Sequence, residues 1–212
     1  MARSAGTGAV RLAARALQPP GPIPHARSQV SISNSPRRLN CGCGPCGIPG
    51  WINADRLVAA GVDLCCDLRT GLPIDEASID YAVAIHVLQD LAWSEIPPAL
   101  GELRRVLAPG GVLRLGLPDL ERAIDAYHRG DDRYFYVPDE HARSLGAKLV
   151  TQIVWYGSVR TPFTYEYAAE MLAAAGFRRV TQCEFGQTHT RHADIASLDN
   201  RERESLFVEA TK

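Results

Sequence analysis

Glycines and an acid stand at the ends of short apolar runs early in the chain. A run containing Leu39 leads into Gly42-x-Gly44, and Asp55 follows eleven residues after Gly44, at the end of the next apolar run. Glycines directly after a strand allow a tight turn and close approach of the backbone to a ligand. An acid at the end of the next strand can accept hydrogen bonds from ribose hydroxyls. This spacing predicts either a nucleotide-type site or a plain turn between two strands.

The same arrangement recurs further along the chain. Asp67 follows the apolar run 62–66, and His86 follows the apolar run 79–85. In open α/β sheets, ligands bind outside the carboxyl ends of the strands. We therefore expect Asp55, Asp67 and His86 near one such edge. The alternatives are a solvated acid at Asp55, a turn-starting aspartate at Asp67 and a hydrogen-bonded core histidine at His86.

Short apolar runs alternate with helical patterns from Arg37 onward. Strands are expected at residues 39–41, 51–54, 62–66, 79–85, 112–117, 178–185 and 205–210. Helices are expected after Ser94 up to Pro109-Gly110-Gly111, and at residues 120–127, 143–156 and 164–175. The last two strands are joined by a loop alone, so they should pair antiparallel. The pattern predicts an α/β fold, a doubly wound, mostly parallel seven-stranded Rossmann-like sheet with an antiparallel closing strand.

Charge is unevenly distributed along the 212 residues. The formal net charge is −1, but residues 1–54 hold six arginines and no acid, so the remainder is acidic. An acidic body argues against nucleic-acid binding, which rests mainly on phosphate neutralisation. No apolar run approaches the ~20 residues that span a bilayer. We expect a cytoplasmic monomer or homodimer with a small-molecule acceptor and no nucleic-acid or membrane partner.

The first 36 residues differ in composition from the rest. They contain Gly, Ser and Pro clusters, such as Pro19-Pro20-Gly21-Pro22, and no sustained apolar periodicity. We predict a disordered or loosely docked extension over residues 1–36 and a single domain over 37–212. An acid-poor N-terminus containing Arg and Ser is also typical of transit peptides, so targeting is the alternative.

The cysteines allow a metal-site hypothesis. Cys41-x-Cys43-x-x-Cys46 has the composition of a thiolate cluster, but no histidine or second cysteine pair follows at zinc-finger spacing. Cys65 and Cys66 fall in an apolar run, where a small buried residue is the simpler interpretation. No secretory signal is visible, so we expect reduced thiols and no bound metal.

Six short motifs follow one another in a fixed order along the chain. They are Leu39-Asn40-Cys41-Gly42-Cys43-Gly44, Gly50-Trp51-Ile52-Asn53-Ala54-Asp55, Asp67-Leu68 with Leu72-Pro73, Ile79-Asp80, His86-Val87-Leu88 and Arg105-Val106-Leu107-Ala108-Pro109-Gly110-Gly111. This set resembles that of class I S-adenosylmethionine-dependent methyltransferases, in particular a small bacterial group with an L-N-x-G-C-G opening and a G-W-x-N-x-D second strand. The resemblance covers residues 37–119 closely and 163–212 in outline.

The resemblance implies S-adenosyl-L-methionine as cofactor. Gly42 and Gly44, with Cys43 between them, would let the loop backbone touch its methionine part, and Asp55 would bind the ribose hydroxyls. Asn40 stands where many members carry an acid, so the amino group of the methionine part would find a carbonyl instead.

The resemblance also implies roles for later strand ends. Asp67 and the backbone of Leu68 would face the adenine amino group. His86 would lie under the sulfonium and line the substrate side. Gln89-Asp90 replaces the Glu-His pair usual in the group, which leaves an altered specificity or a loss of activity open.

Aromatic residues concentrate between residues 127 and 167, where nine of the fifteen lie. Methyltransferases of this class build a substrate lid in this region, and aromatics line small-molecule pockets. We expect Trp155 or Tyr156, with Tyr134 or Tyr136, to contact a methyl acceptor. The alternative is that these rings only pack the lid onto the sheet.

The expected activity is methyl transfer to a small organic acceptor, with His86 or His141 as the proton acceptor when the target is a hydroxyl. The alternatives are an RNA or protein acceptor and a binding protein that holds the cofactor or S-adenosylhomocysteine without turnover. A nicotinamide site is disfavoured, because the acid falls eight residues after Gly47, without room for the usual helix.

Overall fold

The structure is a computed structural model that describes residues 36–45 and 47–212. The predicted extension over residues 1–36 therefore lies, except for its last residue, outside the described residues. No helix within these two ranges is long and apolar enough to cross a membrane.

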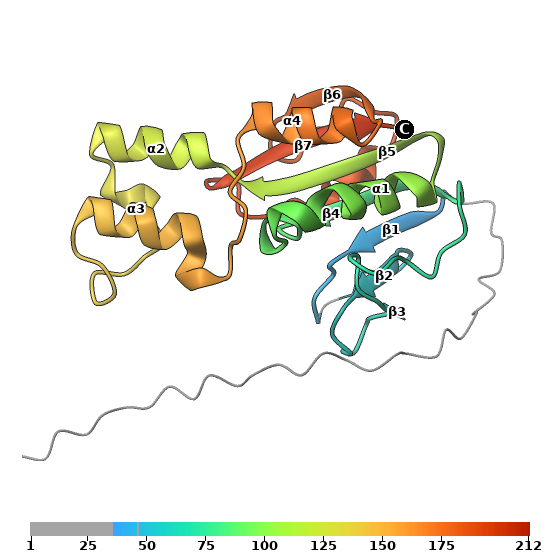
Figure 1. Ribbon diagram of the computed structural model, residues 1–212, viewed down its shortest axis with the longest axis horizontal. Coiled ribbons are helices and arrows are strands. Elements are labelled where there is room, and N and C mark those ends of the chain that lie inside the picture. Colours follow the sequence, from blue (N-terminus) through green and yellow to red (C-terminus); the bar gives the residue numbers. More distant parts are fainter. Residues whose placement is uncertain (1–35, 46) are drawn as a thin grey trace, which may run out of the picture. The chain divides into compact units, whose positions relative to one another are not determined.

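Seven strands form one sheet in the order β3-β2-β1-β4-β5-β7-β6. All neighbouring strands are parallel except at β7, which is antiparallel to both β5 and β6 (Figure 1). This confirms the predicted fold class and the antiparallel closing strand. The strands are β1 (Arg38–Cys41), β2 (Ile52–Asp55), β3 (Leu64–Cys65), β4 (Ile79–Ile85), β5 (Leu107–Pro118), β6 (Arg178–Cys183) and β7 (Ser205–Thr211).

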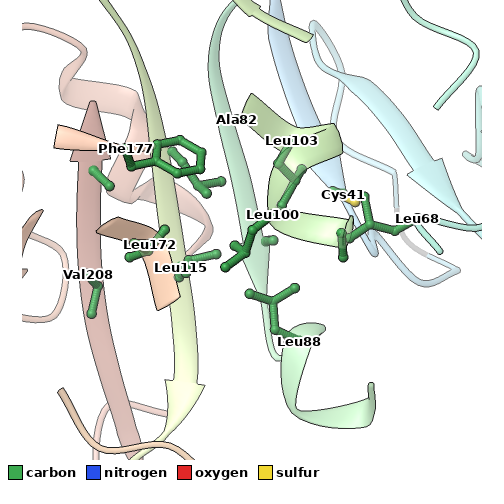
Figure 2. Close-up of a cluster of buried hydrophobic side chains, with 14 of the residues drawn as sticks. Cys41, Leu68, Ala82, Leu88, Leu100, Leu103, Leu115, Leu172, Phe177 and Val208 are labelled. Atoms are coloured by element: carbon green, nitrogen blue, oxygen red, sulfur yellow. The ribbon is translucent and has the colours of Figure 1, made fainter. Parts of the chain in front are cut away.

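Two helices, α1 (Ile96–Val106) and α4 (Tyr165–Ala174), cover one face of the sheet and contact each other (Figure 1). Leu100 and Leu103 of α1 lie against the sheet near Leu115, and Leu172 of α4 lies beside them (Figure 2). All four side chains are almost completely buried. Full burial of such a side chain stabilises the fold by about 1.5–3 kcal/mol, so these helices hold the central strands in place.

The opposite face carries a smaller apolar cluster. Trp51 and Tyr81 meet edge to face with ring centroids 5.4 Å apart, and Ile195 packs against them. Ile195 belongs to the short 3₁₀ helix η5 (Ala193–Leu198), whose Asp194 accepts a 2.6 Å hydrogen bond from the Tyr81 hydroxyl.

Helices α2 (Leu120–Arg129) and α3 (Leu145–Val154) pack against each other beyond the carboxyl end of β5 (Figure 1). Asp119 caps α2 by accepting a hydrogen bond from the backbone N–H of Arg122. The predicted helix 143–156 ends at Val154, because Trp155 and Tyr156 adopt left-handed φ angles of 39° and 55°.

Two other boundaries differ from expectation. The expected strand 62–66 is reduced to Leu64–Cys65. Strand β5 begins at Leu107, five residues before the expected start, because Pro109-Gly110-Gly111 forms an irregularity within the strand, opposite Ile79 and Tyr81 of β4.

Candidate active site

Two cavities adjoin at the carboxyl ends of the parallel strands. The first, of about 170 Å³, is lined by the loop after β1 and the ends of β2, β3 and β4; we call it the strand cavity. The second, of about 260 Å³, is lined by the ends of β4 and β5 and by α2, α3 and the residues after them; we call it the helix cavity. His86 and Asp90 line both cavities.

Gly42 brings the backbone of the loop after β1 to the wall of the strand cavity. It has a φ of 73°, and a Cβ atom there would lie 2.2 Å from Cγ2 of Val87. Its N–H donates a 2.7 Å hydrogen bond to the carbonyl of Ala54 at the end of β2. Only glycine fits this close approach to Val87, so the loop backbone forms this part of the cavity wall without a side chain.

Asp55 ends β2 and lines the strand cavity. Its Oδ2 accepts a 2.9 Å hydrogen bond from the N–H of Gly44, and its Oδ1 accepts one of 2.9 Å from the N–H of Leu57. A carboxylate has about four lone-pair positions. Asp55 therefore holds the glycine loop and keeps acceptor capacity for hydroxyl donors in the cavity.

Asp67 also lines the strand cavity, but Arg69 occupies its carboxylate. Oδ1 accepts 2.9 Å hydrogen bonds from both the Nε and the backbone N–H of Arg69. These hydrogen bonds lower the pKa of Asp67, so its carboxyl group stays ionised. Arg69 reaches Glu95 at 3.5 Å, and Glu95 in turn contacts Arg160 at 2.9 Å. A ligand amino group at Asp67 would have to share it with Arg69.

His86 stands at the junction of the two cavities with a left-handed φ of 55°. Its Nε2 lies 2.8 Å from Oγ of Ser205, which also lies 3.3 Å from the carbonyl oxygen of Asn200. The imidazole tautomer decides whether Nε2 or Oγ is the donor between His86 and Ser205. Nδ1 is buried without a partner among the described residues. Burial, followed by the charge of Arg201, lowers the pKa of His86 to about 4.

The helix cavity combines apolar walls with polar groups. Tyr134 and Trp155 line it together with Leu120, Ala123 and Ile153. The polar residues in its wall are His86, Gln89, Asp90, Asp119, Gln152, Ser158, Arg201 and Glu204. A concave wall that combines aromatic and apolar side chains with polar groups is a feature of sites for small organic ligands.

Gln89 is the buried member of the Gln89-Asp90 pair. It is 5% exposed, and its Oε1 has no hydrogen-bond partner within the described ranges. Its backbone carbonyl accepts hydrogen bonds from the N–H groups of Arg160 and Thr161, which ties the segment after α3 to the segment after β4.

Several predicted residues lie apart from both cavities. Asn40 is buried and donates a 3.2 Å hydrogen bond to Asn53. The N–H of Gly44 donates a hydrogen bond to Asp55, but neither Gly44 nor Cys43 beside it lines a cavity. His141 is exposed, with Nδ1 2.8 Å from the hydroxyl of Tyr156, another exposed residue.

Tyr136 also lines neither cavity. It is exposed and lies under the guanidinium of Arg203, 3.9 Å from the ring centroid. Of the four aromatics expected at an acceptor, the structure thus brings Tyr134 and Trp155 to the helix cavity and leaves Tyr136 and Tyr156 on the surface.

Sequence reasoning missed Arg201 and Glu204 as cavity residues. Both precede β7, more than 110 residues after His86, and no local pattern marks them. Asp119 had a signal, since it follows the end of β5 at the edge where ligands bind.

Among the residues that the structure describes, no group of three or more potential metal ligands lies together. Cys46 lies outside those residues, so the expectation that the Cys41-x-Cys43-x-x-Cys46 segment binds no metal stays a prediction. Burial, the largest cause, raises the pKa of Cys41 to about 12, so this thiol stays protonated at neutral pH.

Residues 52–115, from β2 to the middle of β5, match the family model described as a methyltransferase domain. The matched residues are thus similar to methyltransferase domains. No protein of curated function matches the sequence significantly.

Solved structures share the fold. One is an S-adenosylmethionine-dependent methyltransferase from Thermotoga maritima, described as a possible histamine N-methyltransferase; it is 18% identical with a TM-score of 0.53, over 85% of this chain and 84% of that chain. Another is an S-adenosylmethionine-dependent methyltransferase from Mesorhizobium loti, 17% identical with a TM-score of 0.50, over 83% of this chain and 90% of that one.

Proposed function

We propose that this protein is an S-adenosylmethionine-dependent methyltransferase that acts on a small organic acceptor. The observation that carries the proposal is that two cavities meet at His86 and Asp90. The strand cavity is the proposed cofactor site and the helix cavity the proposed acceptor site. The methyltransferase-domain match over residues 52–115 supports the same interpretation.

The residues of the strand cavity fit the cofactor chemically. Gly42 offers backbone without a side chain, and Asp55 offers carboxylate acceptor capacity for ribose hydroxyls. Asp67 and the backbone of Leu68 line the place proposed for the adenine. When bound, S-adenosylmethionine would supply an electrophilic methyl group, to which the acceptor's lone pair bonds while the sulfur keeps the electron pair of the broken bond.

The protein's own residues would then orient the acceptor and handle its proton. Tyr134 and Trp155 place aromatic surface in the helix cavity, which excludes water and aligns a small ligand. His86 is held by Ser205 and presents a neutral ring at the junction. Asp90 lines both cavities and is exposed, so a proton that it accepts can pass to solvent. We therefore favour His86 and Asp90 over His141 as the groups near the reacting atoms.

The test is a transfer experiment with the full-length protein and S-adenosylmethionine labelled in the methyl group. Small-molecule, RNA and protein fractions of one cell extract are incubated separately. We expect protein-dependent label in the small-molecule fraction. Label in the RNA or protein fraction alone would refute the small acceptor, and cofactor binding without transfer to any fraction would favour a binding protein.

A further inference from the structure

The helix cavity contains more hydrogen-bond acceptors and negative charge than its own residues satisfy. Three carboxylates line it, those of Asp90, Asp119 and Glu204, against one guanidinium, that of Arg201. Asp119 is held by Arg122, whose Nε lies 3.1 Å from its Oδ2.

Asp90 is the carboxylate without an ion pair. Glu204 has Arg201 at 3.7 Å, whereas Asp90 has no ion-pair partner within the part of the chain that the structure describes. Partial burial raises the pKa of Asp90, and Arg56, the Gln89 side chain and Arg201 oppose this in part. Among the carboxylates of this cavity, Asp90 is thus the one without a positively charged partner in the described residues.

Gln89 supplies an independent sign of a missing donor. The side chain of Gln89 ends in an amide, whose Oε1 can only accept hydrogen bonds. Oε1 is buried without a partner within the described ranges, in a residue that lines the cavity. The terminal amide torsion of glutamine is soft, so Oε1 can turn toward a ligand. Leaving such an acceptor unpaired is unfavourable.

His86 adds a second buried polar atom without a partner. Its Nδ1 has no hydrogen-bond partner among the described residues. Oε1 of Gln89 and the carboxylate of Asp90, which has no ion pair there, can each accept a hydrogen bond from a ligand. Trp155 and Tyr134 add ring faces, which attract cations.

From these acceptors we infer that the helix cavity binds a small organic amine as its ammonium cation, with Asp90 as counter-ion and Gln89 as a further hydrogen-bond acceptor. This inference rests on the proposed function, because the amine nitrogen would be the methyl acceptor. The ammonium must lose one proton before its lone pair can form the new bond. That proton passes to Asp90 and then to solvent, since Asp90 is exposed.

The cavity volume limits the size of the amine. At about 260 Å³ it lies just below the ~300–1,000 Å³ usual for ligand pockets. A single-ring or short-chain amine is a size that suits it.

The test is calorimetric titration of the full-length protein with two sets of matched probes. Benzylamine, benzyl alcohol and benzoate form one set, and butylamine, butanol and butyrate the other. Each is titrated with and without S-adenosylhomocysteine. We expect at least one amine to bind at least ~10-fold more tightly than its alcohol and carboxylate partners, a difference of about 1.4 kcal/mol. Equal binding of an alcohol or carboxylate, or no binding of either amine, overturns the inference.

Three variants locate the effect. Asp90→Asn should weaken amine binding about 10-fold and leave alcohol binding unchanged. Asp125→Asn is the matched control, because Asp125 is an exposed acid of α2 paired with Arg129, and it should change neither. Gln89→Leu should weaken amine binding without lowering the melting temperature, because it removes an unpaired buried acceptor. Amine affinity unchanged in both Asp90→Asn and Gln89→Leu would refute the assignment.

Titration with S-adenosylhomocysteine alone separates this inference from the proposed function. Failure of S-adenosylhomocysteine to bind contradicts the proposed function. Binding of S-adenosylhomocysteine without binding of either amine contradicts only the choice of an amine.

Discussion

Nε2 of His86 and Oγ of Ser205 share a 2.8 Å hydrogen bond, which joins the end of β4 to the first residue of β7. The bond places a neutral imidazole at the junction of the two cavities. Because burial lowers the pKa of His86 to about 4, the folded protein takes up this proton only in acid.

Folding stability should therefore depend on pH through His86. The unfolded chain binds the proton below about 6.5, whereas the folded protein binds it below about 4. Between these values the unfolded state holds more protons, so stability falls as the pH is lowered from about 6.5 and levels off below about 4. The loss should be no more than about 3 kcal/mol, at 1.36 kcal/mol per pKa unit.

Urea unfolding at several pH values measures this loss in the wild type and in His86→Gln. Carboxylates titrate in both proteins, so the difference between the two curves isolates His86. The stability advantage of the wild type should shrink steadily from pH 6.5 to 4. Parallel curves would contradict a neutral, buried His86.

The fold was predictable where local sequence and tertiary contacts agree. Strand β4 occupies the expected Ile79–Ile85, and Thr164 caps α4 as expected. The early start of β5 was not predictable, because Pro109-Gly110-Gly111 has turn chemistry and is retained in the strand only by its pairing with β4.

The site was predictable along the parallel strands and not beyond them. Asp55, Asp67 and His86 share one cavity because carboxyl ends of parallel strands meet at one edge. Trp155 lines the helix cavity because the chain makes a left-handed turn there. No residue type in the sequence indicates that turn. Arg201 lines the same cavity because it directly precedes β7, which pairs antiparallel with β5. This pairing joins residues far apart in the sequence, so local patterns do not predict it.

Trp155 and Tyr156 are neighbours with different environments, so they form a matched pair. Trp155 lines the helix cavity, whereas Tyr156 is 54% exposed and its hydroxyl shares a hydrogen bond with His141. Trp155→Ala should lower kcat/KM for the acceptor at least ~10-fold, about 1.4 kcal/mol of transition-state stabilisation, with a small change in melting temperature. Tyr156→Ala should leave both nearly unchanged. Equal losses in the two variants would mean that the helix cavity is not the acceptor site.

Arg114 makes a buried ion-pair group that stabilises the sheet. Its Nε lies 2.7 Å from Asp199 and its NH1 2.8 Å from Glu209, and the Arg114 side chain is fully buried. Arg114→Met should destabilise the protein by about 3–5 kcal/mol, because it leaves two buried carboxylates unpaired. Arg129→Met, which breaks an exposed pair, should cost at most about 1 kcal/mol. Urea unfolding measures both, and similar costs would contradict the buried group's role.

Alanine substitutions at Gly42 and Gly44 test how closely the loop packs at the wall of the strand cavity. Both have left-handed φ angles, but only at Gly42 would a Cβ atom meet a neighbour, at 2.2 Å from Val87. Gly44→Ala should cost about 1–2 kcal/mol of backbone strain. Gly42→Ala should cost about 1–3 kcal/mol more through overpacking. Equal melting temperatures for the two variants would contradict this packing.

Binding of S-adenosylhomocysteine tests the central claim most directly. Calorimetry of the full-length protein should show one site in the micromolar range, about −8 kcal/mol. Asp55→Ala should weaken binding by about 1–3 kcal/mol through loss of a hydrogen-bonding partner. Asp55→Asn, which keeps an acceptor oxygen, should weaken it less. Absence of S-adenosylhomocysteine binding would contradict the account, and tight binding of NADH instead would indicate a nicotinamide site.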